Sequence, residues 1–132
     1  MEDMLQIDNP EAAAALGDLL RDHKGIDVTV LDLREQETWT DFFVITTVTS
    51  GTHLDGLERH IVEFCRKREI EVLRRSRKPN ALEDEWRIID LGSIVIHLMN
   101  RRARDFYELE RLFSGSPAKP FFTTDPYSSS YS

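Results

Sequence analysis

The chain has 132 residues and a formal net charge of −7 at pH 7. This length suits a single domain, and a content of 40% hydrophobic and 31% charged residues excludes a disordered acidic chain and a fibrous protein. The acid excess disfavours generic binding to nucleic acid or anionic lipid, because phosphates repel it. No apolar stretch reaches the roughly 20 residues of a membrane-spanning helix. The single cysteine, Cys65, cannot form a disulfide within the chain, so a reducing, cytoplasmic setting is expected.

The charge is distributed unevenly along the chain. Residues 1–58 hold 13 acids and 3 bases, whereas residues 59–78 hold 3 acids and 8 bases. Two interpretations of this basic block remain open: an RNA-binding surface, or the solvated end of a helix and rim of a strand. The second is favoured, because the block contains no aromatic residue on which a base could stack. Its main members are Arg66, Lys67, Arg68, Arg74, Arg75, Arg77 and Lys78.

The first predicted element is a helix over residues 10–24. Asn9 can cap its start, Pro10 is preset for the first helical position, and Glu11 faces the positive end of the helix dipole. Gly25 is expected to take the left-handed conformation that ends the helix.

Two strands are predicted next, over residues 28–33 and 42–49, because both stretches are rich in β-branched and aromatic residues. A polar stretch separates them, so they are expected to pair as a hairpin. A second helix then begins near Ser50, whose hydroxyl is a good cap, and ends near Lys67 or Arg68. Its apolar face follows spacings of three and four through Leu54, Leu57, Ile61 and Phe64 or Cys65.

A short strand over residues 71–75 and a loop over residues 76–85 are predicted to follow. Residues 86–99 then indicate a hairpin of two strands, in which Gly92 and Ser93 have the spacing of a two-residue turn.

The last predicted helix covers residues 105–113, and its apolar side is formed by Phe106, Leu109, Leu112 and Phe113. Residues 114–132 hold six Ser and three Pro, which is typical of an extended tail. Three helices and about five strands in mixed order predict one layered α+β or α/β domain with a mixed sheet.

The hairpin over residues 86–99 places large side chains on both of its faces, because residues alternate between the faces of a strand. One face carries Trp86, His97 and Met99, with Tyr107 nearby in the chain. These residues form either an exposed patch suited to binding a protein or a second buried layer. The sequence leaves both interpretations open.

Few residues have the spacing of a catalytic or metal site. Asp90 and His97 could pair across the hairpin as an acid and base, but no nucleophile or oxyanion element accompanies them, so a buried histidine is the favoured interpretation. The sequence contains no HExxH or CxxC motif and no Walker or GxGxxG loop, so neither a metal nor a phosphate loop is predicted. The hydroxyls between Thr46 and Thr52 could hold an anion or simply cap the following helix.

Six sequence pieces occur in an order that resembles the ribosome silencing factor family, also called RsfS or Iojap. The resemblance covers about residues 10–113, and each piece is weak alone. In chain order they are Val30-Leu31-Asp32-Leu33, Thr40-Asp41-Phe42-Phe43-Val44-Ile45, Thr49-Ser50 to His53, Trp86-Arg87-Ile88-Ile89-Asp90-Leu91-Gly92, Val95-Ile96-His97-Leu98-Met99, and Arg104 to Tyr107-Glu108-Leu109-Glu110.

The resemblance implies an α/β/α sandwich similar to the nucleotidyltransferase fold but without its catalytic carboxylates, over residues 1–113, followed by a tail over residues 114–132. It implies a non-enzymatic translation repressor without a cofactor. Members of the family bind the basic protein number fourteen of the large ribosomal subunit and block joining of the small subunit when nutrients are scarce. The positions that match the family's contact surface are chiefly Trp86 and Tyr107, with Asp90, His97 and Met99 as neighbours by strand alternation.

The resemblance also allows a homodimer when the partner is absent. Three departures from the family pattern are visible, at Val48, at Ser93 and in the loop over residues 75–85. The last two lie near the expected interface, so they bear on partner affinity and not on the fold.

An alternative function remains open beside this one. A small nucleotide-handling enzyme with the related fold would use the hydroxyls near Ser50 together with Asp41 or Asp32.

Overall fold

The computed structural model describes residues 9–36, 38–77 and 85–112, with the side chains of residues 110 and 112 left aside. The elements are α1 (Asn9–Asp22), β1 (Ile26–Asp32), β2 (Phe42–Val48), α2 (Gly51–Lys67), β3 (Arg74–Arg77), β4 (Trp86–Asp90), β5 (Ile94–Asn100), α3 (Arg101–Tyr107) and α4 (Leu109–Leu112).

The strands form one mixed sheet with the order β1-β2-β5-β4-β3. β2 and β5 run parallel at its centre, and the other neighbours are antiparallel. The two predicted hairpins, β1 with β2 and β4 with β5, are therefore confirmed. Gly92, with φ +95°, makes the expected tight turn with Ser93, closed by a hydrogen bond from the Leu91 N–H to the Ile94 carbonyl (2.8 Å).

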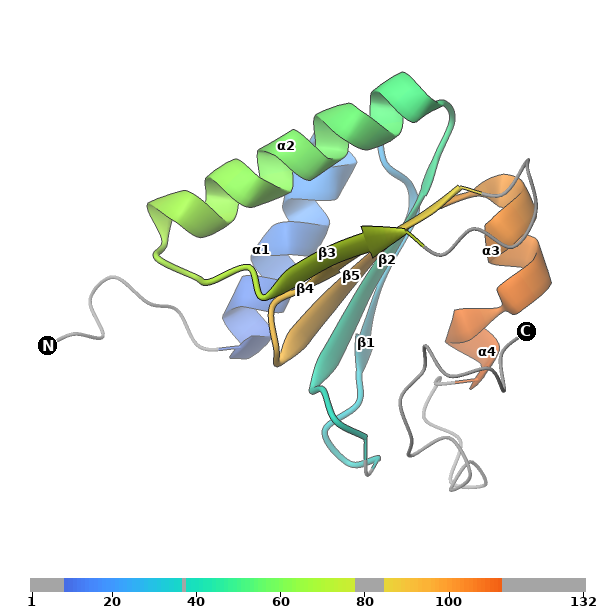
Figure 1. Ribbon diagram of the computed structural model, residues 1–132. Coiled ribbons are helices and arrows are strands. Elements are labelled where there is room, and N and C mark those ends of the chain that lie inside the picture. The colour runs from blue at the N-terminus through green and yellow to red at the C-terminus, as the bar shows by residue number, and fades with distance from the viewer. Residues whose placement is uncertain (1–8, 37, 78–84, 113–132) are drawn as a thin grey trace, which may run out of the picture.

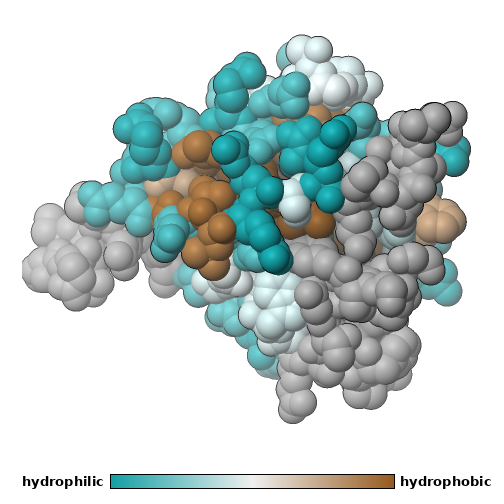
Figure 2. All heavy atoms as spheres, viewed as in Figure 1, coloured by the Kyte–Doolittle hydropathy of each residue, from teal (hydrophilic) through white to brown (hydrophobic). Residues whose placement is uncertain are grey.

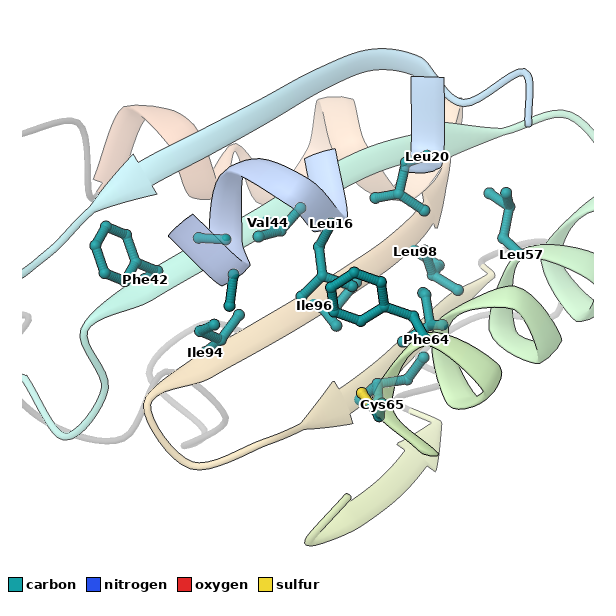
Figure 3. Close-up of a cluster of buried hydrophobic side chains, with 14 of the residues drawn as sticks. Leu16, Leu20, Phe42, Val44, Leu57, Phe64, Cys65, Ile94, Ile96 and Leu98 are labelled. Carbon is teal, nitrogen blue, oxygen red and sulfur yellow. The ribbon is translucent and has the colours of Figure 1, made fainter. Parts of the chain in front are cut away.

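Helices cover both faces of the sheet, with α1 and α2 on one face and α3 and α4 on the other (Figure 1). Figure 3 shows the core under α1 and α2, where Leu16 of α1 lies close to Val44 and Ile96 of the central strands, and Leu57 of α2 belongs to the same cluster. A second core lies under α3 and α4. The predicted α/β/α arrangement with about five strands is confirmed. Both faces of β2 and β5 are buried, which is consistent with the mostly apolar composition of these strands.

The connection from α1 to β1 differs from the expected glycine cap. Lys24 takes the left-handed conformation, with φ 72°, and Gly25 does not. Gly25 is needed for space instead, because a Cβ there would lie 2.6 Å from the Thr46 Oγ1 and 2.8 Å from the Leu20 carbonyl oxygen. The Gly25 N–H also donates to the Leu20 carbonyl (2.7 Å). The left-handed conformation is therefore at Lys24, and the position that is too crowded for a side chain is the next residue, Gly25.

The second helix follows the prediction. The Ser50 Oγ accepts a hydrogen bond from the His53 N–H (3.0 Å) at its start, and the helix ends at Lys67. The predicted apolar residues are all buried: Leu54, Leu57, Ile61, Phe64 and Cys65.

Two elements were predicted with the wrong boundaries. β3 covers Arg74–Arg77 and not residues 71–75, so it includes two residues that were predicted as loop. α3 begins at Arg101, where the Asn100 side chain accepts a hydrogen bond from the Ala103 N–H (2.9 Å), and it stops at Glu108, which has φ 51°.

The helix predicted over residues 105–113 is therefore two short helices with a break, and residue 113 lies outside the described residues. Phe106, expected on the apolar side, is 67% exposed. The buried side is formed instead by Ala103, Arg104 and Tyr107.

In the described part of the chain, no helix is long and apolar enough to cross a bilayer.

Candidate partner-binding site

Four of the five predicted site residues come together under α3. Trp86 opens β4 and lies opposite Met99 of β5, while His97 and Tyr107 lie beside the indole. All four are buried, with exposed fractions of 3% for Trp86, 0% for His97 and Met99, and 5% for Tyr107. The expectation of an exposed patch is therefore wrong, and the alternative of a second buried layer is right. The cause is α3 with the start of α4, which covers this face of the sheet.

The side chains of this layer contact one another through defined ring geometries. The Trp86 Nε1–H donates to the His97 Nδ1 (3.0 Å), and the Phe43 ring meets the imidazole edge-on, with centroids 4.4 Å apart. The Trp86 and Tyr107 ring centroids are 4.5 Å apart. Phe106 then packs edge-on against Tyr107 at 4.8 Å. We call Trp86, Tyr107 and Phe106 the aromatic stack; it leads from the buried layer to the surface.

The environment of His97 does not suit acid–base chemistry. Burial lowers the pKa of His97 to about 3, because a charged imidazole is poorly solvated in an apolar layer. The Nδ1 accepts the indole hydrogen bond, so the proton of the neutral ring lies on Nε2. His97 is therefore neutral at physiological pH.

Asp90 lies apart from the other four predicted residues. In the register of the hairpin it faces Val95, whereas His97 faces Ile88. Its carboxylate accepts from the Gly92 N–H (2.8 Å) and contacts the Arg74 guanidinium (3.5 Å). The alternative in which Asp90 pairs with His97 is therefore wrong, and the favoured interpretation of a buried histidine is confirmed. The His97 imidazole accepts a hydrogen bond from Trp86, and Asp90 stabilises the turn.

Arg104 holds α3 on the sheet, a role that the sequence analysis missed. It is 5% exposed, and its guanidinium donates to the Thr47 Oγ1 (3.0 Å), the Thr29 Oγ1 (3.0 Å) and the Ile26 carbonyl (3.4 Å). A signal was present, because Arg104 stands three residues before Tyr107 and so shares its helix face. However, Arg104 follows two other arginines in the sequence, so the sequence alone does not distinguish it from a solvated residue.

The outer surface of α3 combines one exposed aromatic residue with charges of both signs. Phe106 is the exposed end of the aromatic stack. Around it, the described exposed charges are Arg101, Arg102, Asp105, Glu108 and Arg111. Among the described residues, the surface around Phe106 therefore carries charges of both signs.

The residues of the alternative nucleotide site do not converge. Ser50 follows the end of β2, whereas Asp41 precedes its start, and the seven residues of β2 span about 20 Å. Asp32 lies at the same end as Asp41, because it pairs with Phe42. The Asp32 carboxylate is also bound by Arg34 (2.7 Å). In the portion of the chain with described placement, no group of three His, Cys, Asp or Glu side chains could hold a metal ion.

Several cations of the basic block are paired with acids. The Arg66 guanidinium contacts Glu63, and Arg75 contacts Glu58 (3.1 Å). Glu58 is a buried carboxylate of α2 that also binds Arg87 of β4. This arrangement fits the interpretation of a solvated helix end and strand rim, whereas Lys78 lies outside the described residues. RNA binding by the block stays an untested prediction.

Comparison with known proteins identifies relatives along most of the chain. A family model described as "Ribosomal silencing factor during starvation" matches residues 6–129, further than the resemblance over residues 10–113 indicated. The ribosomal silencing factor RsfS of Treponema pallidum is 37% identical over 102 residues, which cover 77% of this chain and 89% of that protein. A mouse protein named "Mitochondrial assembly of ribosomal large subunit protein 1" is 32% identical over 96 residues, covering 73% of this chain and 42% of that protein.

The fold also matches solved structures. A crystal structure of a protein from Chromobacterium violaceum superimposes with a TM-score of 0.70 at 22% identity, covering 92% of this chain and 100% of that one. At this level of identity the match supports the fold alone.

Proposed function

The chain belongs to the ribosomal silencing factor family, and from this premise we propose that it represses translation by binding the large ribosomal subunit and blocking the joining of the small subunit. The observation that carries the proposal is the family match over residues 6–129. The mouse relative, named for assembly of the large ribosomal subunit, supports that subunit as the partner. In this proposal the protein acts as a steric block and not as an enzyme, because occupying a surface requires no reaction. Its place of action is the cytoplasm.

The partner on the large subunit is a basic ribosomal protein, number fourteen of that subunit. The chain as a whole is acidic, at −7, and a basic protein offers it an attractive surface on a particle whose RNA repels it. The contact surface is centred on Phe106, because this aromatic side chain is 67% exposed on top of the aromatic stack. Trp86, His97, Met99 and Tyr107 support this surface from below, whereas Asp90 lies apart from it at the β4–β5 turn.

The buried position of Trp86 changes how the contact should be tested. Replacing Trp86 with Ala would empty part of a core and lower the stability of the fold, so a loss of binding would be ambiguous. Phe106→Ala removes an exposed side chain without opening a core. We expect it to weaken binding to large subunits by about 1–2 kcal/mol, or roughly 5- to 30-fold, as for an aromatic residue at an interface centre.

The measurement is co-sedimentation of the purified full chain with large subunits, followed by a subunit-joining assay at saturating protein. Trp39→Ala is the matched control, because Trp39 is a partly exposed aromatic residue in the β1–β2 connection, and this variant should bind normally. Sedimentation of the protein alone reports any homodimer formed in the absence of a partner. Joining that continues unimpeded at saturating protein would refute the proposed block, and equal binding by both variants would refute the Phe106 surface.

A further inference from the structure

The sheet has two edge strands, and they are built differently. β1 carries a bulge between Ile26 and Thr29, where Asp27 has φ 52° and its carboxylate binds Arg101 of α3 (2.5 Å). A bulge and a charged residue protect an edge from pairing with another strand. β3 at the opposite edge pairs with β4 on one side, and no other described strand lies beside it. Its outer backbone groups are therefore placed to pair with an added strand.

An apolar patch lies directly beside this edge. Leu73, the residue before β3, is 55% exposed, and three half-buried apolar residues surround the same connection: Ile70, Val72 and Leu91. Figure 2 shows hydrophobic atoms over the connection from α2 to β3, next to hydrophilic atoms over β3. We call Leu73 and the residues of β3 the edge surface.

The edge surface is strongly basic. Three of the four residues of β3 are arginines. The Arg74 and Arg75 side chains remain 58% and 52% exposed although Arg74 contacts Asp90 and Arg75 contacts Glu58. A guanidinium has five N–H donors in a fork that matches a carboxylate, so a paired and half-exposed arginine can still bind a further acid.

We propose that the edge surface binds an extended acidic segment of a partner protein, which adds to the sheet as a strand next to β3. Main-chain hydrogen bonds to β3 hold the segment, its carboxylates face the arginines, and an apolar side chain rests on Leu73. This interaction is separate from the proposed contact at Phe106, because α3 packs on one face of the sheet over β5 and β2, whereas β3 is an edge strand (Figure 1).

Charge distinguishes this occupant from two others. A second copy of the chain that paired its β3 with this β3 would place arginines against arginines, which is destabilising. RNA phosphates would suit the arginines, but the described edge surface offers no aromatic side chain for base stacking, and an exposed leucine beside an open strand edge suits a peptide better.

The test uses the full chain and a labelled synthetic peptide of alternating glutamate and valine, with a lysine–valine peptide as the charge control. Fluorescence anisotropy should show that the glutamate peptide binds the chain and that the lysine peptide does not. Arg77→Glu and Leu73→Asn should each weaken it, the first by about tenfold. Arg102→Glu, an exposed arginine of α3, is the matched control and should bind the peptide normally. Circular dichroism checks that each variant is folded.

Hydrogen exchange distinguishes strand addition from simple charge attraction. Binding of the glutamate peptide should slow the exchange of amides in β3 and leave those of β1 unchanged. The proposal would be overturned by an absence of peptide binding, by equal affinity of Arg77→Glu and Arg102→Glu, or by binding without protection of β3. The proposal would also be overturned if polyuridylate displaced the peptide and bound the wild-type chain more tightly than the peptide does.

Discussion

His97 shows how burial sets the chemistry of one side chain. The imidazole lies between the Trp86 indole and the Phe43 ring and is fully buried. Desolvation by burial lowers its pKa. The residue therefore acts as a neutral hydrogen-bond acceptor that fixes the indole under α3.

The neutral state of His97 predicts a pH dependence of stability. Its pKa is about 3 in the folded chain and about 6.5 when unfolded. Between these values the unfolded chain binds a proton that the folded chain does not, so the free energy of unfolding falls as the pH is lowered from about 6.5 toward 3. The slope from this residue approaches 1.4 kcal/mol per pH unit, as an approximate limit.

Urea unfolding at several pH values measures this slope. His97→Gln retains a neutral acceptor for the indole and removes the titrating group, so its stability should depend less on pH by about one proton. His23→Gln, at the exposed end of α1, controls for the loss of a histidine elsewhere. An unchanged slope in His97→Gln would show that other groups cause the acid sensitivity.

At the scale of elements, α3 is a short helix that depends on its contacts with the sheet. Its seven residues are too few to be stable alone. Arg104 ties it to β1 and β2 through the hydroxyls of Thr29 and Thr47, and Arg101 adds the exposed ion pair with Asp27. The position of α3 in turn decides whether Trp86 and Tyr107 are buried.

Replacing Arg104 should loosen α3. Arg104→Met keeps much of the side-chain length but leaves two hydroxyls and a carbonyl without their charged donor, so we expect a loss of roughly 2–3 kcal/mol in the free energy of unfolding. Near-ultraviolet circular dichroism should also change, because Trp86 lies under the helix. Arg102→Met on the exposed side of the same helix is the control. Equal stability of the two variants would contradict the anchoring role.

At the scale of the whole molecule, the strands at the centre of the sheet are the most deeply buried. β2 and β5 are covered by helices on both faces and flanked by strands on both sides. β3 is short, mostly exposed and at the edge. Local opening therefore costs least at β3 and most at the centre.

Hydrogen exchange of the free protein should reveal this order. Amides of β2 and β5 should exchange slowest, near the rate set by global unfolding, and those of β3 much faster. Exchange of β3 as slow as that of β2 would mean that the edge is covered in solution, and it would also weaken the case for an added strand.

The sequence by itself predicted much of the local structure and the family. The spacing of Leu54, Leu57 and Ile61 predicted α2 correctly, Ser50 predicted its start, and Gly92 predicted the last hairpin turn. These features depend on residues close together in the chain, for which helix periodicity and turn geometry are reliable signals. The six ordered sequence pieces likewise indicated the ribosomal silencing factor family, which the family match confirmed.

The tertiary structure alone decided which of the predicted site residues are accessible. Strand alternation placed Trp86, His97 and Met99 on one face, but it could not show whether another element covers that face. The cover is α3, and Arg104 fastens it to Thr29, 75 residues earlier in the chain. Burial therefore depends on contacts between distant residues, which local periodicity does not encode. For that reason Trp86, His97, Met99 and Tyr107 are buried, whereas Phe106, at the outer end of the aromatic stack, is exposed.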